Sequence, residues 1–444
     1  MSDWSGEVFE VRLGTPGHGG FCVARHEGRV LFVRHGLPGE LVRALVTEDR
    51  GGSFCRAEAI EILEASSDRV DAICPVSGPG GAGCCDFSFA TPEAQRGLKA
   101  AVVAEQLRRL AGWEKDIVVE PIPVDGAEAT RGWRSRMRLA VDADGRAGVH
   151  RYRGSEVITD LRCPQPMTGA MAGIADRKWT PGADLVVAVD GEGQRHIVEL
   201  APPAEYAPGR RGDRAHGRRG RGRDDRVARG GAGDRRSAVA RRSAASAVRA
   251  ETVVEGSGRA VQYVEGRRWE LAATGFWQPH YAAAQAYSDV VAEWAYAAPG
   301  SSAWDLYSGV GVFAARVAEQ VGPTGSVHGV ESARSAVADG AEALRDLPWI
   351  ELRAERVERW IAEQPYIAPE VVVLDPPRAG AGKEVIAALA EHAPRRIVHI
   401  GCDPASFARD INLYRAAGYM PTELRAFDAF PGTHHVECLA LLEL

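Results

Sequence analysis

The sequence predicts an α/β protein with a doubly wound parallel sheet in its C-terminal part, a small β-barrel at its N-terminus and an α+β region between them. Three observations carry this prediction. From about residue 270 onward, continuous apolar runs alternate with helical stretches, as in a parallel sheet covered on both faces. Residues 1–64 hold short apolar runs separated by Gly and Pro, and residues 204–250 contain almost no large apolar side chains.

Residues 1–64 form the first predicted domain. Gly and Pro breaks between short strands are typical of a small, OB-like barrel. Such barrels bind single-stranded nucleic acid in many proteins and are plain structural modules in others, and the pattern alone favours neither. The strand-like runs are Glu7–Leu13, Gly19–Ala24, Val30–Val33 and Leu37–Val46.

The second predicted domain, residues 65–203, mixes helix and strand. A helix is expected from about Thr91 to Leu110. Strands around Arg134–Val141 and Ala147–His150 are separated by a turn that contains Asp-Gly, which predicts a hairpin. This region is therefore interpreted as a central α+β subdomain.

Residues 204–250 consist mainly of Arg, Gly, Asp, Ala and Ser, so we expect a disordered insertion that cannot bury enough surface to fold. One interpretation is an arm that attracts RNA through phosphate contacts, and the other is a dispensable insert. The chain has no uninterrupted apolar stretch of about 18 residues and no signal-peptide pattern. We expect a cytoplasmic monomer without membrane contact, whose eight cysteines are too sparse for a disulfide framework.

The third predicted domain, residues 251–444, alternates buried strands with helices such as Glu384–His392. Polar or glycine residues follow several strands at the edge where open α/β sheets bind ligands. Gly309 and Gly311 allow a tight turn and close approach of a ligand to the backbone. The predicted strands are Trp304–Tyr307, Val327–Glu331, Val371–Asp375 and Ile397–Ile400.

Carboxylates at these strand ends favour a nucleoside-bearing cofactor. Asp305 precedes the glycine turn, and Glu331 ends the next strand, where it can accept hydrogen bonds from a ribose. Asp375 is followed by two prolines, which hold the loop in a rigid extended geometry. An ordinary strand-to-helix turn is the alternative explanation of the proline pair.

Cys402 follows the last of these strands, 27 residues after Asp375. A thiol at the end of a parallel strand, beside a second strand that ends in Asp-Pro-Pro, indicates a nucleophile. The alternative is a buried structural cysteine, the more common fate of a lone Cys. The neighbouring motifs favour the nucleophile.

Taken in order, these segments resemble the bacterial RNA 5-methyluridine methyltransferases, which join an N-terminal TRAM barrel to a class I methyltransferase domain. The resemblance covers almost the whole chain apart from residues 204–250. The segments that carry it are Phe32-Val33 with Leu37–Glu40, Phe276–His280, Asp305–Phe313, Asp375–Arg378, Gly401–Pro404 and Phe430–Glu437.

The resemblance implies methyl transfer from S-adenosylmethionine to C5 of a uridine in ribosomal or transfer RNA. Uracil C5 is a weak nucleophile, so a thiolate must first add at C6, which is the role implied for Cys402. Glu437 is the implied base that removes the C5 proton. The positions implied to bind the cofactor are Gln278, Asp305, Tyr307, Gly309, Gly311, Glu331 and Asp375.

Many relatives carry four cysteines for a [4Fe-4S] cluster, and Cys74, Cys84, Cys85 and Cys163 supply four thiols here. Ala82 occupies the first place of the family's Cys-x2-Cys pair, and adjacent cysteines are awkward ligands for one cluster. The sequence leaves open whether a cluster binds or has been lost. Relatives also often place Asp or Asn where Arg356 stands, which leaves adenine recognition unassigned.

Two other functions compete with RNA uridine methylation. The acidic-Pro-Pro loop also occurs in methyltransferases that act on an exocyclic amine or a small molecule. A non-catalytic RNA-binding protein would instead use the barrel and the Arg-rich segment. The presence of Cys402 and Glu437 in their motifs favours uridine C5.

Overall fold

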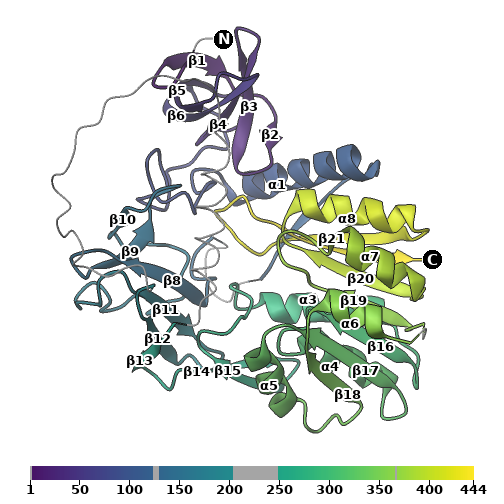
Figure 1. The fold of residues 1–444 in the computed structure, drawn as a ribbon. Coiled ribbons are helices and arrows are strands. Elements are labelled where there is room, and N and C mark those ends of the chain that lie inside the picture. Colours follow the sequence, from purple (N-terminus) through teal and green to yellow (C-terminus); the bar gives the residue numbers. More distant parts are fainter. Residues whose placement is uncertain (1–2, 124–129, 204–248, 366–367) are drawn as a thin grey trace, which may run out of the picture.

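The computed structural model describes residues 3–123, 130–203, 249–365 and 368–444. An N-terminal curled sheet, a central sheet and a large C-terminal α/β sheet follow one another along the chain (Figure 1). The predicted insertion at 204–250 lies outside the described residues, apart from residues 249 and 250.

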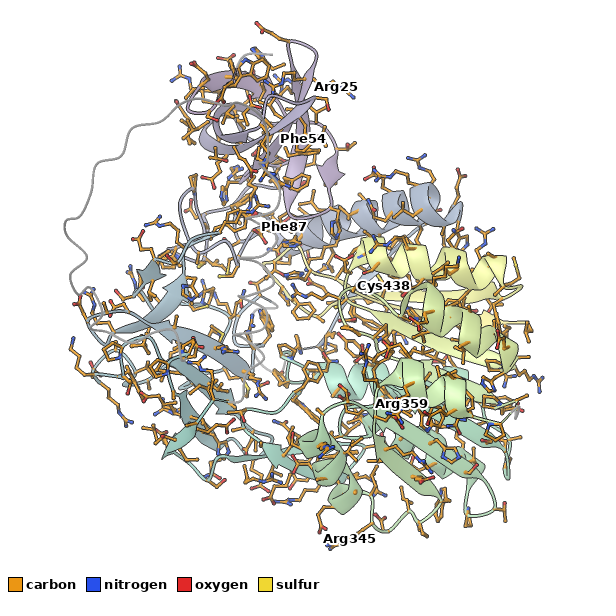
Figure 2. The ribbon with its side chains drawn as sticks, viewed as in Figure 1. Arg25, Phe54, Phe87, Arg345, Arg359 and Cys438 are labelled. Atoms are coloured by element: carbon orange, nitrogen blue, oxygen red, sulfur yellow. The ribbon has the colours of Figure 1, made fainter. Side chains whose placement is uncertain are left out.

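The N-terminal sheet has six strands in the order β1-β5-β6-β4-β3-β2. Side chains alternate along β4, so that Leu31 and Val33 enter the core while Phe32 lies on the outer face. Figure 2 shows Phe54 and Arg25 on this part of the molecule. The strands are β1 (Val8–Arg12), β2 (Pro16–Gly17), β3 (Phe21–His26), β4 (Arg29–Arg34), β5 (Leu41–Asp49) and β6 (Phe54–Glu64).

The loop at 74–86, here called the cysteine loop, leads to the predicted helix, which is α1 (Pro92–Gln106). Thr91 caps its N-terminus, where the Thr91 hydroxyl accepts a hydrogen bond from the Ala94 amide at 3.3 Å. A wider turn, η1 (Leu107–Ala111), continues the helix to Gly112, whose positive φ of 58° ends it. The predicted helix boundaries are therefore close to those observed.

The central sheet has the order β10-β9-β8-β11-β12-β13, and β8 with β9 forms the predicted hairpin. Residues 251–255, which we assigned to the C-terminal domain, pair with β12 in this sheet. A two-stranded hairpin of β14 (Arg259–Val264) and β15 (Arg267–Ala272) follows. The sheet strands are β8 (Arg136–Val141), β9 (Ala147–His150), β10 (Val157–Ile158), β11 (Asp184–Val189), β12 (Arg195–Leu200) and β13 (Glu251–Glu255).

The C-terminal sheet has eight strands in the order β18-β17-β16-β19-β20-β22-β21-β7. The first five are parallel, and β22 runs antiparallel to both of its neighbours. The strands are β7 (Val119–Pro121), β16 (Ser302–Leu306), β17 (Ser326–Glu331), β18 (Ile350–Ala354), β19 (Val371–Leu374), β20 (Arg396–Gly401), β21 (Met420–Asp428) and β22 (Glu437–Glu443).

Helices cover both faces of this sheet, which confirms the predicted doubly wound fold. One face, here called the α3 face, packs against α3 (Ala283–Ala295), α4 (Val312–Val321) and α5 (Arg334–Ala343). The opposite face packs against α1, α6 (Val357–Glu363), α7 (Gly382–Glu391) and α8 (Pro404–Ala416). Alternation along each strand therefore decides which helices a strand-end side chain meets.

Candidate active site

Four of the predicted site residues lie on the α3 face at one end of the sheet. Asp305 and Glu437 lie within strands, Asp375 and Cys402 directly follow strands, and each of the four stands two positions from a core residue of the α3 face. The pairs are Asp305 with Ala303, Asp375 with Val373, Cys402 with Ile400, and Glu437 with Leu439. The charges of Glu437, Asp375 and Cys402 also act on Tyr287 of α3. The strand pattern thus brings the predicted nucleophile, base and two carboxylates to one side.

The register of β20 and β22 places Cys402 beside Glu437. Gly401 pairs with Cys438 at the end of this antiparallel ladder, so Cys402 and Glu437 directly adjoin its last pair, and the charge of Glu437 acts on the Cys402 thiol. On the other side, Glu437 pairs with Phe427 of β21. Two residues 35 positions apart in the sequence therefore meet at the sheet end.

Cys402 is a neutral thiol near pH 7. Burial, followed by the negative charges of Glu437 and Asp375, raises the pKa of the Cys402 thiol to about 12. The Arg378 guanidinium acts in the opposite direction and lowers this pKa. Addition to a substrate therefore requires that the thiol lose its proton, and Arg378 favours that loss.

Glu437 is a buried carboxyl with one oxygen free. Its side chain is almost fully buried, and Oε1 has no hydrogen-bond partner within the described structure. Burial and the charge of Asp375 raise the pKa of Glu437 well above its usual value, while Arg378 lowers it. A buried, unpartnered carboxyl oxygen is costly unless a ligand meets it, so this atom indicates a functional role.

The glycine turn after β16 is built by left-handed backbone. Tyr307, Gly309 and Gly311 have φ values of 63°, 55° and 80°. Asp305 Oδ2 accepts a hydrogen bond from the Ala314 amide at 2.8 Å and so ties β16 to the first turn of α4. Among the described residues Asp305 Oδ1 is buried without a partner, and burial raises the pKa of this carboxyl to about 7.

Glu331 and Gln278 complete the predicted cofactor side. Glu331 Oε2 accepts from the Gly309 amide at 3.3 Å, and Oε1 accepts from the Ala333 amide at 2.7 Å. Gln278 Nε2 lies 3.5 Å from Asp375 Oδ2. Tyr307 is half-buried and also packs against the core of the opposite face. Glu331 is therefore hydrogen-bonded to the glycine turn, whereas Gln278 is hydrogen-bonded to Asp375.

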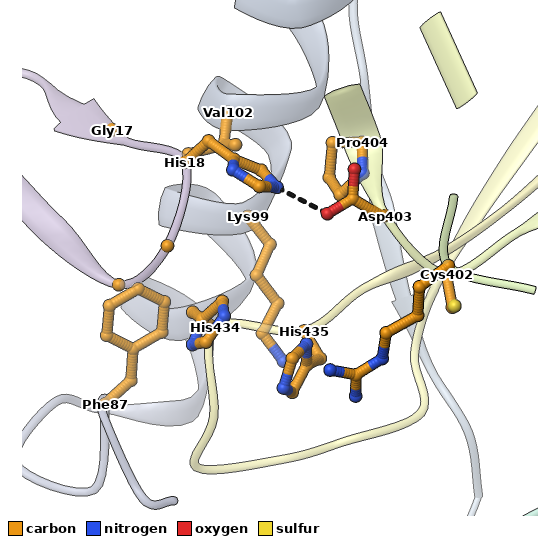
Figure 3. Close-up of a pocket in the computed structure, with 13 residues that line it drawn as sticks. Gly17, His18, Phe87, Lys99, Val102, Cys402, Asp403, Pro404, His434 and His435 are labelled. Carbon is orange, nitrogen blue, oxygen red and sulfur yellow. Dashed lines mark hydrogen bonds and ion pairs between the residues drawn. The ribbon is translucent and has the colours of Figure 1, made fainter. Parts of the chain in front are cut away.

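A cavity of about 120 Å³ opens beside Cys402 (Figure 3). Segments that are far apart in the sequence line it: the turn at 17–20, helix α1, the loop that carries Arg378, residues 402–404 and residues 434–435. His18 Nε2 lies 2.8 Å from Asp403 Oδ2, which connects the N-terminal sheet to the residue after Cys402. The cavity is therefore shared by all three parts of the fold.

His434 and His435 line the same cavity as Cys402. Burial, followed by nearby positive charges, lowers the pKa of His434 to about 4 and that of His435 to about 2. Both imidazoles are therefore neutral near pH 7. His434 Nδ1 also contacts the Asp86 carboxylate, so its ring is oriented by the cysteine loop.

Three of the four predicted cluster cysteines, Cys74, Cys84 and Cys85, interact directly. Hydrogen bonds with Cys85 lower the pKa values of Cys74 and Cys84, the latter to about 7. Burial, together with the charges of Cys84 and Cys74, raises the pKa of Cys163 to about 12. Thiolates are chemically suited to an iron–sulfur cluster. Within the described ranges, however, no group of three or more His, Cys, Asp or Glu side chains is arranged to hold a metal ion. The [4Fe-4S] cluster stays a prediction that this arrangement does not support.

Among the residues that line the cavity, sequence reasoning assigned no role to His18, Lys99 or Arg378. Arg378 had a usable signal, because it follows Asp375 and the two prolines directly. Lys99 lies within a helical pattern and His18 within a Gly-rich turn, and neither pattern distinguishes a site residue from a surface one. Their places depend on how the three parts of the fold assemble.

The fold and the site together define an S-adenosylmethionine-dependent methyltransferase. A family model described as tRNA (Uracil-5-)-methyltransferase matches residues 351–444, and a TRAM domain model matches residues 5–60. A relative from Streptomyces avermitilis, described as an uncharacterized RNA methyltransferase, is 39% identical over 99% of this chain and 98% of its own length. A 23S rRNA (uracil(1939)-C(5))-methyltransferase from Alkalilimnicola ehrlichii is 30% identical over 98% of this chain and 97% of its own.

Among solved structures, the chain is similar to the Pyrococcus abyssi tRNA (uracil-54, C5)-methyltransferase in complex with S-adenosyl-L-homocysteine. The TM-score is 0.65 at 19% identity, over 98% of this chain and all of the other. The protein belongs to the RNA uracil-C5 methyltransferase family with an N-terminal TRAM domain. This membership confirms the resemblance and disfavours a non-catalytic RNA-binding protein.

For the part of the chain that the structure describes, no helix combines the length and apolar character needed to cross a membrane. The expected cytoplasmic location and monomeric state stay predictions.

Proposed function

We propose that this enzyme methylates C5 of a uridine in RNA through a covalent bond between Cys402 Sγ and C6 of the uracil. The observation that supports the proposal is the end of the β20–β22 ladder: its last pair, Gly401 with Cys438, stands next to Cys402 and Glu437, and the charges of Glu437 and Asp375 act on the Cys402 thiol. A methyltransferase acting on an amine needs neither a thiol nor a second base at this position.

The described residues fit the cofactor. S-adenosylmethionine supplies the methyl group when it is bound. Asp305 Oδ1 is a buried acceptor without a partner in the described ranges, and a side chain at Gly309 would start in open space. Glu331, at the end of β17, stands where a carboxylate accepts from a ribose. We assign the binding of the cofactor to Gln278, Asp305, Tyr307, Gly309, Gly311, Glu331 and Asp375.

The first step on the protein is loss of the Cys402 proton to solvent. The thiolate then forms a bond to C6, and the electron pair of the C5–C6 double bond moves to C5 and the O4 enolate. Arg378 assists because its positive charge lowers the pKa of Cys402. The resulting nucleophilic C5 accepts the methyl group, and the former sulfonium sulfur keeps the bonding pair as a neutral thioether.

Glu437 completes the reaction as the base. Because burial raises its pKa, Glu437 must first lose its own proton to solvent. Its carboxylate then removes the C5 proton, the released pair re-forms the C5–C6 double bond, and the Cys402 thiolate leaves. The Oε1 atom, unpartnered among the described residues, supplies a free lone pair for this proton. Arg378 again assists, since it lowers the pKa of Glu437 and favours the ionised form.

The RNA class follows from an assay on separated fractions. The full-length relative described above acts on 23S rRNA, whereas the matching family model is named for tRNA. The purified enzyme is incubated with labelled S-adenosylmethionine and either ribosomal or transfer RNA, and the nucleosides are separated. We expect 5-methyluridine in one fraction, and its absence from both would contradict the proposed reaction.

The covalent step is tested with two variants. Glu437→Gln cannot remove the C5 proton, so we expect it to accumulate a protein–RNA adduct that survives denaturing electrophoresis. Cys402→Ala removes the attacking sulfur and should form none. Equal adduct in both variants would exclude Cys402 as the nucleophile.

Cys438 provides a matched control for the thiol. It pairs with Gly401 in the same ladder but points into the opposite core. The double variant Glu437→Gln, Cys438→Ala should therefore accumulate the adduct as Glu437→Gln does. A folded double variant that forms no adduct would contradict the assignment of the covalent bond to Cys402.

A further inference from the structure

We propose that Tyr287 of α3 is a positioning residue for the base. Its hydroxyl donates a hydrogen bond to the ionised Glu437 carboxylate, directly or through one water molecule. This bond orients the carboxylate toward the C5 proton and favours its charged form. The inference rests on the proposed function and adds to it the group that stabilises the base in its reactive state.

Tyr287 occupies a position of α3 where an apolar side chain would fill the core equally well. It is fully buried, and its hydroxyl has no hydrogen-bond partner within the described structure. A buried hydroxyl without a partner destabilises a fold, so its presence here indicates a partner that it meets in another state of the enzyme. The residues of α3 that share this apolar core with Tyr287 are Ala283, Ala284, Val290, Val291, Trp294 and Ala295.

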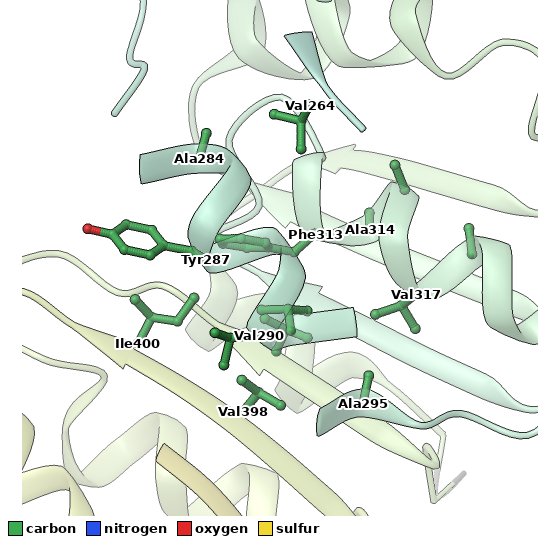
Figure 4. Close-up of a cluster of buried hydrophobic side chains, with 14 of the residues drawn as sticks. Val264, Ala284, Tyr287, Val290, Ala295, Phe313, Ala314, Val317, Val398 and Ile400 are labelled. Atoms are coloured by element: carbon green, nitrogen blue, oxygen red, sulfur yellow. The ribbon is translucent and has the colours of Figure 1, made fainter. Parts of the chain in front are cut away.

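Tyr287 lies beside the cross-strand partner of Glu437. The ring centroids of Tyr287 and Phe427 are 5.8 Å apart. Phe427 pairs with Glu437 in the β21–β22 ladder, and paired residues of antiparallel strands project from the same face with Cβ atoms about 4.5–5.5 Å apart. Figure 4 shows the Tyr287 hydroxyl at the edge of the apolar cluster, directed away from Phe313. The hydroxyl and the base therefore share the α3 face.

Free polar atoms and charges identify Glu437 as the acceptor. Burial, followed by the charge of Glu437 and then that of Asp375, raises the pKa of Tyr287 well above its usual value, so the phenol keeps its proton and can donate it to a hydrogen bond. Asp375 Oδ2 already lies 3.5 Å from Gln278 Nε2. Of the two carboxylates, only Glu437 has a buried oxygen, Oε1, without a partner among the described residues.

The ionised form of Glu437 needs such a donor. Burial and the charge of Asp375 raise the pKa of Glu437, and Arg378 lowers it. A hydrogen bond to the charged form lowers the pKa further, so Tyr287 acts in the same direction as Arg378. The neighbour on β21, Phe427, carries no charge. The titratable groups that are electrostatically linked to Glu437 are Asp375, Arg378, Cys402, Cys438 and Tyr287.

The first test is an infrared titration of the full chain without RNA. The carbonyl band of a protonated carboxyl that disappears in Glu437→Gln reports the protonation of Glu437. Tyr287→Phe removes only the hydroxyl, and loss of one hydrogen bond to a charged group changes the ionisation equilibrium by about tenfold. The midpoint of this band should therefore rise by about one pH unit in Tyr287→Phe.

Tyr419→Phe is the matched control for the loss of a buried phenol. Tyr419 packs in the core of the opposite face and donates to the Pro394 carbonyl. This variant should leave the Glu437 midpoint unchanged. Tyr287→Phe removes a hydroxyl that has no partner in the described structure, so we expect it to stay folded, and thermal melting verifies this.

The second test follows release of the protein–RNA adduct. Enzyme, S-adenosylmethionine and RNA react at one pH until the adduct forms, a rapid jump to other pH values starts its release, and denaturing gels measure the decay. The sulfur of Cys402 is bonded to C6 in the adduct, so its own titration does not contribute. Release from Tyr287→Phe should be about tenfold slower below the Glu437 midpoint and equally fast well above it.

Two outcomes overturn the inference. An unchanged Glu437 midpoint in folded Tyr287→Phe would exclude the hydrogen bond, and release slowed by the same factor at every pH would exclude an effect on the ionisation of the base. The infrared titration does not depend on the reaction. Absence of both adduct and 5-methyluridine, together with a raised midpoint in Tyr287→Phe, would overturn the proposed function and support the link between Tyr287 and Glu437.

Discussion

At the scale of single residues, we expect the protonation state of Cys402 to determine how the rate of adduct formation depends on pH. The pKa of this thiol is raised to about 12, so the thiolate is a small fraction at pH 7. Below the pKa that fraction grows about tenfold per pH unit. We expect adduct formation by Glu437→Gln to accelerate about tenfold per unit between pH 7 and pH 9, measured by rapid quench and gel electrophoresis.

Arg378 gives the matched variant for this pH profile. Its charge lowers the pKa of Cys402, so Arg378→Gln in the Glu437→Gln background should slow adduct formation at every pH below the thiol pKa. The slope against pH should stay the same. A flat pH profile in the parent variant would show that loss of the thiol proton does not limit the rate.

A second residue-scale prediction concerns Tyr287, on α3. The side chain is fully buried, and its hydroxyl has no hydrogen-bond partner within the described structure (Figure 4). A buried unsatisfied hydroxyl destabilises a fold by about 1–3 kcal/mol. Tyr287→Phe should therefore raise the melting temperature measured by differential scanning fluorimetry, whereas Tyr419→Phe, which removes a hydrogen bond to the Pro394 carbonyl, should lower it. A lower melting temperature for Tyr287→Phe would contradict this.

At the scale of elements, α1 is attached to the C-terminal sheet by a buried ion pair. Lys99 contacts the Asp428 carboxylate at the end of β21 and donates to the Phe430 carbonyl at 3.1 Å. Lys99→Met leaves Asp428 buried and unpaired, which costs about 3–5 kcal/mol. We expect that decrease in the free energy of unfolding by urea. Addition of Asp428→Asn should recover part of it, and equal stability of the single and double variants would exclude the ion pair as the cause.

The sequence predicted those elements whose own residues carry a strong pattern. The strands that end in Leu306, Glu331, Leu374 and Gly401 were found because each is a short segment rich in apolar residues that stands between helical stretches. Strand β7 was not found, since three residues carry no periodicity and its partner is β21, about 300 positions away. Local pattern cannot indicate a pairing that distant.

The residues of the candidate site also fall into two groups, those that the sequence predicted and those that it did not. Cys402, Glu437 and Asp375 were predicted because motifs fix them at strand ends, and sheet geometry then fixes their common face. His18 and Lys99 were missed, because their places in the cavity depend on docking of the N-terminal sheet and α1. Such docking is a long-range packing result, which a single sequence does not encode in any short segment.

At the scale of the whole molecule, one cavity depends on three parts of the chain. The N-terminal sheet supplies the turn at 17–20, the central region supplies α1, and the C-terminal sheet supplies Cys402. Only the folded assembly therefore encloses the thiol. The C-terminal domain alone would therefore hold the residues proposed to bind the cofactor but would lack both the turn at 17–20 and α1.

The segment from 204 to 248 provides the last prediction, because its ends are held together. The Ala201 amide donates to the Ala250 carbonyl at 2.9 Å, and Arg249 contacts both the Ala201 carbonyl and Asp184. A six-residue Gly/Ser linker therefore spans the gap. Each halving of a loop lowers its closure cost by about 0.6 kcal/mol, so this deletion should stabilise the fold by roughly 2 kcal/mol.

We therefore expect the deletion variant to melt no lower than the full chain and to keep forming 5-methyluridine. Loss of cooperative melting would show that the segment contributes to the fold. The salt dependence of RNA binding then distinguishes the two interpretations of its arginines. If they bind phosphates, deletion makes the slope of log K against log salt shallower by about 0.7–0.9 for each phosphate that is no longer neutralised, whereas a dispensable insert leaves the slope unchanged.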